Sequence, residues 1–210
     1  MIRVLITDDH AIVRHGLKKI LSDTDDMSVT GEADTGAQAI KFIREIPCDV
    51  VLLDISLPDR NGIEVLKQIK KERPKLPVLM LSMHTEREFA VRALKAGASG
   101  YLTKQSAPMQ LVAAIRHVFS GKKYITPSLA EEVANMLSGD LEQPAHKVLS
   151  DREYQTLCLI ASGKTLSGIA SELLLSPKTV SVYRSRVLEK LKLRNNSEIT
   201  RYAIKNQLVE

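Results

Sequence analysis

The feature that most constrains this fold is a fivefold alternation of short apolar runs with longer amphipathic stretches over the first 120 residues. Three runs are continuous Val, Leu and Ile segments, which is typical of strands buried on both faces of a parallel sheet. Strand and helix patterns that alternate in this way predict a doubly wound α/β domain with a five-stranded parallel sheet. The predicted strands are 3–7, 28–32, 49–54, 77–82 and 99–103.

The stretches between the strands have a helical period. In the first of them, Ile12, Leu17, Ile20 and Leu21 fall on one apolar face, which is expected to pack against the sheet. The last stretch ends at Gly121, a residue type favoured just beyond a helix because it tolerates a left-handed backbone. We therefore place the end of the α/β domain there.

The pattern changes after Gly121. Thr126 and Pro127 suit the first positions of a short helix, and residues 138–148 contain Gly, Pro and mixed charge without an apolar period. From Leu149 onward four helical segments follow one another, which predicts a small all-α domain. The predicted organisation is an α/β domain at 1–121, a linker with a short helix at 122–148, and a four-helix domain at 149–210.

Composition argues against several classes of protein. The two cysteines, Cys48 and Cys158, lie far apart within apolar stretches, which indicates buried thiols in a reducing compartment rather than a disulfide. No window approaches the roughly 18 unbroken apolar residues that a membrane-spanning helix needs. We expect a cytoplasmic protein that has no membrane partner.

Polar side chains lie at the carboxyl ends of four of the five predicted strands. Asp8 and Asp9 follow the first strand, Asp54 and Ser82 end the third and fourth, and Lys104 follows the fifth. Function in such sheets gathers at the carboxyl ends of the strands, so these side chains should converge. Three converging carboxylates repel one another unless a cation lies among them, and Mg²⁺ suits a site of few carboxylates, waters and phosphate oxygens.

Each side chain in this predicted cluster has a chemical role. Asp54 is a carboxylate nucleophile able to attack phosphorus and form an acyl phosphate. The metal and the Lys104 ammonium would offset charge on the transferring group, and Ser82 could hydrogen-bond one of its oxygens. The alternative for any one of them is an ordinary Asp after a strand, or a solvated turn lysine. The prediction of phosphoryl acceptance depends on all of these side chains occurring together at the strand ends.

Four segments carry a family resemblance. The DDH after the first strand, DISLPDRNG at 54–62, LSMH at the fourth strand and GYLTK at the fifth resemble the receiver domain of bacterial two-component response regulators, which has a flavodoxin-like fold. The resemblance implies that Asp54 is the phosphoacceptor and that a sensor histidine kinase is the donor. One departure is Gln105, since many receivers have a proline after the lysine.

The same resemblance implies a ligand set and a switch. Asp9 and Asp54 would bind Mg²⁺ directly, Asp8 would coordinate through water, and the Ser56 carbonyl would be a further ligand. Ser82 and Lys104 would form the switch pair, with Tyr101 as the aromatic side chain whose rotamer follows phosphorylation. On the residues alone, Tyr101 fits equally well as a strand aromatic packed at the sheet edge.

A candidate DNA-binding helix follows residue 176. Ser176 is a suitable N-cap and Pro177 suits the first helical position, and residues 178–194 hold six basic residues against the single acidic Glu189. Val180, Val187 and Leu191 form its predicted buried stripe. The residues expected to contact DNA are Lys178, Thr179, Ser181, Val182, Ser185, Arg186 and Lys192.

Two of these assignments have alternatives. An apolar Val182 on a polar face suits the methyl group of a thymine in a major groove, but it could also pack on a neighbouring helix or subunit. The basic run could be an ordinary solvated helix face. Arg184 falls near the buried stripe, which is resolved if its stem packs while its guanidinium reaches outward.

The segment from Leu149 to Leu193 resembles the LuxR-type helix-turn-helix module of the NarL/FixJ response regulators. The order of the two domains also matches that family, which implies a phosphorylation-dependent transcriptional regulator that binds promoter DNA. Because one helix-turn-helix reads only a half-site, phosphorylation is expected to favour a homodimer. RNA polymerase is a further partner of such regulators.

Three other functions compete with this one. Aspartyl phosphatases place a second Asp two residues after the first, but this chain has Ser56 there, so we expect no enzyme. A nucleotide-binding fold needs a glycine-rich loop after the first strand, where this chain has DDH. A ligand-sensing regulator with the same DNA module remains open, and acceptance of a phosphoryl group would distinguish it.

Overall fold

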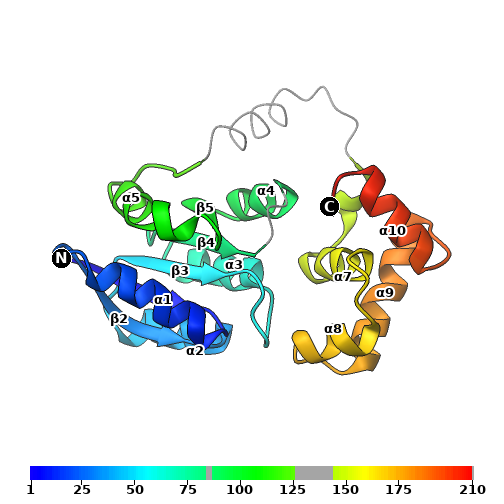
Figure 1. The fold of residues 1–210 in the computed structure, drawn as a ribbon, viewed down its shortest axis with the longest axis horizontal. Coiled ribbons are helices and arrows are strands. Elements are labelled where there is room, and N and C mark those ends of the chain that lie inside the picture. Colours follow the sequence, from blue (N-terminus) through cyan, green and yellow to red (C-terminus); the bar gives the residue numbers. More distant parts are fainter. Residues whose placement is uncertain (84–86, 126–143, 210) are drawn as a thin grey trace. The chain divides into compact units, whose positions relative to one another are not determined.

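The computed structural model describes residues 1–83, 87–125 and 144–209. The chain divides into two compact units, Met1–Val133 and Ala134–Glu210, and the division falls inside the predicted linker. The short helix predicted from Thr126 lies outside the described residues. Figure 1 labels most of the elements of each unit.

The first unit contains a five-stranded sheet in the order β2-β1-β3-β4-β5, and every pair of neighbouring strands is parallel. This confirms the predicted doubly wound architecture. The order reverses between β1 and β3, which is where such sheets place their sites. The strands are β1 (Ile2–Thr7), β2 (Met27–Ala33), β3 (Val50–Asp54), β4 (Val78–Ser82) and β5 (Gly100–Thr103).

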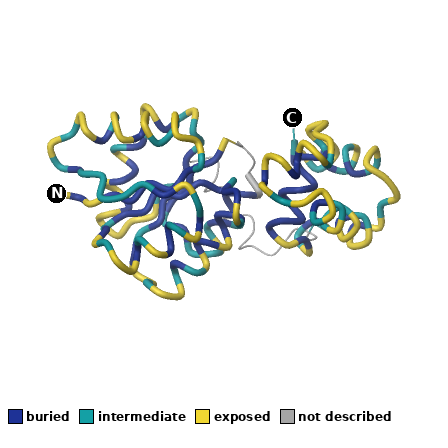
Figure 2. Tube along the Cα trace, turned by 90° about the horizontal axis from the view of Figure 1, so that it is seen from below, coloured by how far each residue is buried: buried dark blue, intermediate teal, exposed yellow. Residues whose placement is uncertain are grey.

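Helices cover both faces of this sheet. The pairing of α1 with α5, and of α3 with α2 and α4, assigns the helices to two separate layers. Figure 2 shows the strands as a buried layer between helices whose outer surfaces are exposed. The helices are α1 (Ala11–Ser22), α2 (Gly36–Glu45), α3 (Gly62–Glu72), α4 (Arg87–Lys95) and α5 (Ala107–Phe119).

Some details of this unit differ from the sequence patterns. Leu17 and Leu21 are buried as expected, but Ile12 is 88% exposed, so it does not belong to the buried face of α1. Gly121 follows α5 with φ of +83°, as its predicted capping role requires. Both cysteines are buried and free, and the described residues contain no cis peptide bond.

The second unit is helical, as predicted. α7 packs against α9 and α10, and α8 packs against α9. Ser150 opens α7 with a capping box, and Ser176 caps α9, because a polar side chain there satisfies free backbone N–H groups. The elements are η1 (Ala145–Val148), α7 (Asp151–Ala161), α8 (Leu166–Glu172), α9 (Pro177–Leu191) and α10 (Asn196–Lys205).

The 3-10 helix η1 occupies residues that the sequence pattern assigns to the linker. Its His146 is buried, and the backbone N–H of His146 donates a hydrogen bond to the Tyr202 hydroxyl on α10 at 3.1 Å. The end of the predicted linker therefore packs with the helical unit. Within the described residues, every helix is too short or too polar to cross a membrane.

Candidate functional site

The side chains predicted to cluster do meet at the carboxyl edge of the sheet. Asp8 and Asp9 follow β1, Asp54 and Ser82 end β3 and β4, and Lys104 follows β5. The parallel register brings these ends to one edge, where Asp8, Asp54 and Ser82 are almost completely buried. We call these five residues the acidic pocket.

One ammonium group serves two buried carboxylates in the acidic pocket. Lys104 Nζ lies 2.9 Å from Asp54 Oδ2 and 2.7 Å from Asp8 Oδ2. Burial raises the pKa of Asp54 to about 6, and the nearby Lys104 charge opposes this shift. Burial lowers the pKa of Lys104, but the two carboxylates outweigh it and hold that pKa above its ordinary value. The acidic pocket thus contains fewer positive charges than carboxylates.

The donor set of the acidic pocket suits a divalent cation. Metal-ligating atoms of Asp8, Asp9, His10 and Asp54 all lie within 4.8 Å of one another. Three carboxylates and one ammonium sum to −3 + 1 = −2, which a divalent ion balances. Carboxylate oxygens are the ligands that Mg²⁺ prefers, so this cluster suits Mg²⁺.

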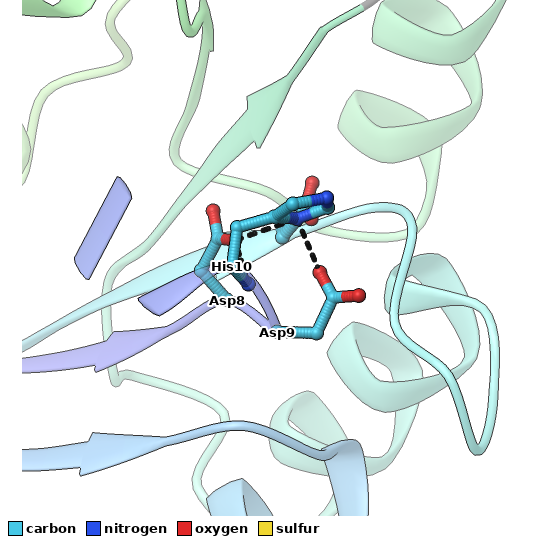
Figure 3. Close-up of side chains that lie close together, drawn as sticks. Asp8, Asp9 and His10 are labelled. Carbon is cyan, nitrogen blue, oxygen red and sulfur yellow. Dashed lines mark hydrogen bonds and ion pairs between the residues drawn. The ribbon is translucent and has the colours of Figure 1, made fainter. Parts of the chain in front are cut away.

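His10 belongs to this cluster although the sequence analysis did not select it. Its Nδ1 lies 2.7 Å from Asp9 Oδ1 and 3.4 Å from Asp8 Oδ1. Figure 3 shows the three side chains meeting beyond the end of β1. The histidine in the DDH triplet was the available signal, since imidazole is a common metal ligand.

The loop after β3 is held tightly against the acidic pocket. A Cβ on Gly62 would lie 2.0 Å from the Asp54 carbonyl oxygen, so only glycine allows this approach. Ser56 pairs with Asn61 in an isolated bridge, and a backbone hydrogen bond from Ser56 favours the ionised form of Asp54. Ser56 therefore lies beside the phosphoacceptor candidate.

Asp59 in this loop has a structural role that the sequence analysis missed. Its Oδ1 accepts a hydrogen bond from Gly36 N at 2.8 Å, and its Oδ2 accepts one from Ala37 N at 2.9 Å. The carboxylate therefore caps α2 from a distant part of the chain, at the end where the helix dipole favours negative charge.

Tyr101 lies on β5 and is buried, with 6% of its surface exposed. It pairs with Met80 of β4. Two residues further along the same two strands, Thr103 pairs with Ser82. Tyr101 and Ser82 thus occupy adjacent strands near the pocket edge. The burial is compatible with both a packed strand aromatic and a switch residue.

The predicted DNA-contacting residues lie on α9, or at its C-terminal end. Val180, Val187 and Leu191 are buried, which confirms the predicted stripe. Val182 is 43% exposed, and its neighbours on that face are exposed or partly exposed. Those neighbours are Lys178, Thr179, Ser181, Ser185 and Arg186, with Lys192 at the helix end.

Two basic residues of α9 bind side chains of neighbouring helices in the same unit. Lys190 Nζ lies 2.6 Å from Glu153 Oε2 on α7, and Arg184 donates a hydrogen bond to Asn196 on α10. Burial opposes the ionisation of Glu153, yet Lys190 and Ser150 hold its pKa below the ordinary value. These two contacts connect α9 to α7 and α10 within the unit.

Comparison with known families assigns the two units. The response regulator receiver domain family matches residues 4–116, more than half of the chain. The chain belongs to the response regulators. Residues 147–203 of this response regulator match the bacterial regulatory proteins of the luxR family. It is a phosphorylation-dependent transcriptional regulator with a receiver domain and a LuxR-type DNA-binding domain.

Relatives of the response regulator match it along nearly its whole length. It is 39% identical over 209 residues to the response regulator UvrY of Escherichia coli K12, covering 99% of this chain and 96% of UvrY. It is 37% identical over 211 residues to the response regulator GacA of Pseudomonas viridiflava, covering 100% of this chain and 99% of GacA.

Solved structures of RcsB are similar to this response regulator as well. RcsB from Salmonella enterica serovar Typhimurium, bound to promoter DNA with the phosphomimetic BeF₃⁻, is 26% identical with a TM-score of 0.65. A structure of two RcsB dimers bound to two parallel DNAs is 29% identical with a TM-score of 0.59. Each match covers 96% of this chain and 97% of the other.

Proposed function

We propose that Asp54 accepts the phosphoryl group and that this transfer controls DNA binding by α9. The observation that carries the proposal is the convergence of Asp8, Asp9, Asp54 and Lys104 at one sheet edge, with Asp54 in contact with Lys104. The phosphoryl donor is a sensor histidine kinase. Its phosphohistidine loses the P–N bond as an Asp54 oxygen bonds to phosphorus, and the imidazole leaves.

The other pocket residues support this transfer. Asp9, Asp54 and the Ser56 carbonyl would hold Mg²⁺ directly, and Asp8 would hold it through water. When bound, the ion supplies charge neutralisation for the phosphoryl oxygens. Lys104 gives a second positive charge, and Ser82 donates a hydrogen bond to a phosphoryl oxygen. Tyr101 and Ser82 transmit the effect of phosphorylation at Asp54. The protein acts as a phosphoryl acceptor rather than as an enzyme that turns over a substrate.

On the DNA side, the exposed face of α9 enters a major groove. Val182 contacts a thymine methyl group, while Lys178, Thr179, Ser181 and Ser185 reach base edges or phosphates. Arg186 and Lys192 contact phosphates. The assembly of RcsB dimers on DNA supports a phosphorylation-favoured homodimer here, since two helices then engage two half-sites. RNA polymerase is the further partner and the cytoplasm the proposed location.

Incubation with acetyl phosphate and Mg²⁺ tests the acceptor assignment. We expect an acid-stable, hydroxylamine-labile adduct on the wild type, no adduct on Asp54→Asn, and a normal adduct on Asp34→Asn, which changes an exposed aspartate. An adduct retained by Asp54→Asn would contradict the assignment of the acceptor. The absence of any wild-type adduct would favour a ligand-sensing regulator.

A second experiment tests the coupling to DNA. Genomic fragments are selected with the full chain, with and without phosphorylation, and the mass of the free protein is followed by sedimentation. We expect phosphorylation to enrich a defined set of promoters and to increase the dimer fraction. Unchanged enrichment and unchanged sedimentation would refute phosphorylation control.

A further inference from the structure

A cavity of about 600 Å³ lies at the amino-terminal edge of the sheet. It is lined in part by Cys48 and Asp49 just before β3, by Pro77 just before β4, and by Phe119 at the end of α5. The five residues of β3 separate this edge from Asp54, a distance of roughly 15 Å at the ordinary rise of a strand. We call it the amino-edge cavity, and it is a different place from the acidic pocket.

Much of the lining of the amino-edge cavity is apolar. This part comprises Cys48, Pro74, Leu76, Pro77 and Phe119. Phe119 is 49% exposed, so its ring is only partly covered by the receiver itself. Burial raises the pKa of the Cys48 thiol, which keeps this side chain uncharged. Because apolar surface gains free energy when it leaves water, the ring or alkyl chain of a ligand would be stabilised here.

The charged side chains that line the amino-edge cavity do not balance one another. Asp49 is matched by Arg3, which donates hydrogen bonds to both of its carboxylate oxygens. Arg73 also lines the cavity, and its Nη1 donates to the carbonyl oxygen of Ile43 at 3.0 Å, an uncharged acceptor. Lys75 is exposed, and within the described residues neither Arg73 nor Lys75 forms an ion pair with a carboxylate. Two positive charges at the cavity are therefore left without a counter-charge.

Two further ammonium groups lie at the same edge of the sheet. Lys70 Nζ donates to the carbonyl oxygen of Leu76 at 2.7 Å, and Lys123 Nζ donates to the carbonyl oxygen of Ala98. Both acceptors are uncharged backbone oxygens. Burial lowers the pKa of both lysines, and the charge of Lys123 lowers that of Lys70 further. These lysines do not line the cavity, but they add to the positive potential around it.

We propose that the amino-edge cavity binds a small organic carboxylate that carries an aromatic ring. The ring packs on Phe119 and Leu76, and the carboxylate lies between Arg73 and Lys75. A guanidinium suits a carboxylate because its planar donors form two parallel hydrogen bonds, and within the described residues Arg73 donates only from Nη1. The volume also fits, since cavities of roughly 300 to 1,000 Å³ are typical of sites for small molecules.

This site gives the receiver a second chemical input. Gly121 also lines the cavity, and it directly precedes the predicted linker, so the ligand lies beside the point at which the chain leaves the receiver. A ligand that binds the folded unit and not the unfolded chain stabilises the fold by mass action. Ligand binding therefore raises the free energy of unfolding of the receiver, independently of any chemistry at Asp54.

Titration of the full chain with phenylpropanoate, followed by two-dimensional amide NMR, tests the proposal. The amide signals of Leu76, Phe119 and Gly121 should shift in one saturable process. Phenylpropanol has the same ring without the charge, and it should bind about tenfold more weakly because a charge-assisted hydrogen bond is lost. Phenylpropylamine carries a positive charge and should produce no saturable shift. Equal affinity for the acid and the alcohol would overturn the proposal, as would the absence of saturable binding.

Two substitutions separate the charge of the site from its apolar surface. Lys75→Gln should weaken phenylpropanoate binding about tenfold and leave phenylpropanol binding unchanged, whereas Phe119→Ala should weaken the binding of both. Lys71→Gln is the matched control, because Lys71 is an exposed lysine close in sequence that does not line the cavity. Phenylpropanoate should raise the thermal midpoint of the wild type and of Lys71→Gln, and raise that of the two cavity variants much less. Equal effects of Lys71→Gln and Lys75→Gln, unchanged binding in both cavity variants, or shifts confined to other residues would each contradict the site.

Discussion

Lys104 donates a hydrogen bond to Asp54 across the carboxyl edge of the sheet, with Nζ 2.9 Å from Oδ2. Only 7% of the lysine side chain and 1% of the aspartate side chain are exposed. A buried carboxylate in this position depends on its counter-charge, because removal of one partner leaves the other charge buried and unpaired. The stability of the receiver is therefore tied to the same residues as its proposed chemistry.

Replacing Lys104 with Met should destabilise the receiver in the absence of divalent cations. The expected loss in the free energy of unfolding is about 3 kcal/mol at pH 8, since the buried carboxylates lose their ammonium. Urea denaturation followed by circular dichroism measures it, and saturating Mg²⁺ should restore part of the loss. Lys95→Met, at an exposed position, is the control; equal effects of the two substitutions would show that the pocket charge does not matter.

The pairing of Asp49 with Arg3 predicts a pH dependence. Arg3 donates to both carboxylate oxygens, and its hydrogen bonds hold the pKa of Asp49 at about 2. Because this pKa lies below the unfolded value of about 3.9, the stabilisation is fully present above about pH 4. It is lost as the pH falls from about 4 to 2.

Asp49→Asn should therefore lower the free energy of unfolding by roughly 1 kcal/mol at pH 7, a value reduced for the partial exposure of the pair. The stability curves of variant and wild type should converge as the pH approaches 2. Urea unfolding at several pH values checks this, with the exposed Asp25→Asn as control. Parallel curves across the whole range would disprove the assignment.

Asp59→Ala should remove the cap that the loop after β3 provides to α2. Loss of a capping carboxylate costs about 1 kcal/mol, and the amides of Gly36 and Ala37 should exchange their hydrogens faster. Thermal unfolding and amide exchange by NMR measure the two effects. Asp34→Ala, one residue before the Thr35 N-cap, is the matched control; unchanged amide exchange in Asp59→Ala would argue against the capping contact.

Val182 and Lys192 should have separable effects on DNA. Val182→Ala should change the preference for bases at one position of the half-site, because it removes an apolar contact. Lys192→Asn should weaken binding to all sequences and reduce its salt dependence, because a phosphate contact is lost. Asparagine is chosen because residue 192 has φ of +56°, which Asn tolerates. Binding to a sequence library at two salt concentrations tests the split.

Much of the pocket could be predicted because it depends on a small number of strong signals. Continuous apolar runs predict where the strands lie. Parallel pairing then brings the carboxyl ends of the strands to one edge, independently of how the helices pack. Asp54, Lys104 and Ser82 follow from that rule alone. The buried stripe of α9 was equally accessible, since Val180 and Val187 lie two helical turns apart.

Other features depend on tertiary contacts that periodicity does not encode. A helical period identifies a face but not how far the sheet covers it, so Ile12 in the first turn of α1 is exposed. The partner of Asp59 is a helix end more than twenty residues away in the sequence. The six basic residues of 178–194 likewise did not indicate that one of them, Lys190, pairs with Glu153 on α7.

The ion pair between Lys104 and Asp8 also has a consequence for protein synthesis. These residues are 104 − 8 = 96 positions apart, and both are needed to complete the pocket. At roughly 5 to 20 residues per second, a ribosome takes about 5 to 20 seconds to translate that interval. Under the proposed function, which assigns Lys104 to phosphoryl acceptance at Asp54, the nascent chain becomes able to accept a phosphoryl group only after its fifth strand and Lys104 have been made.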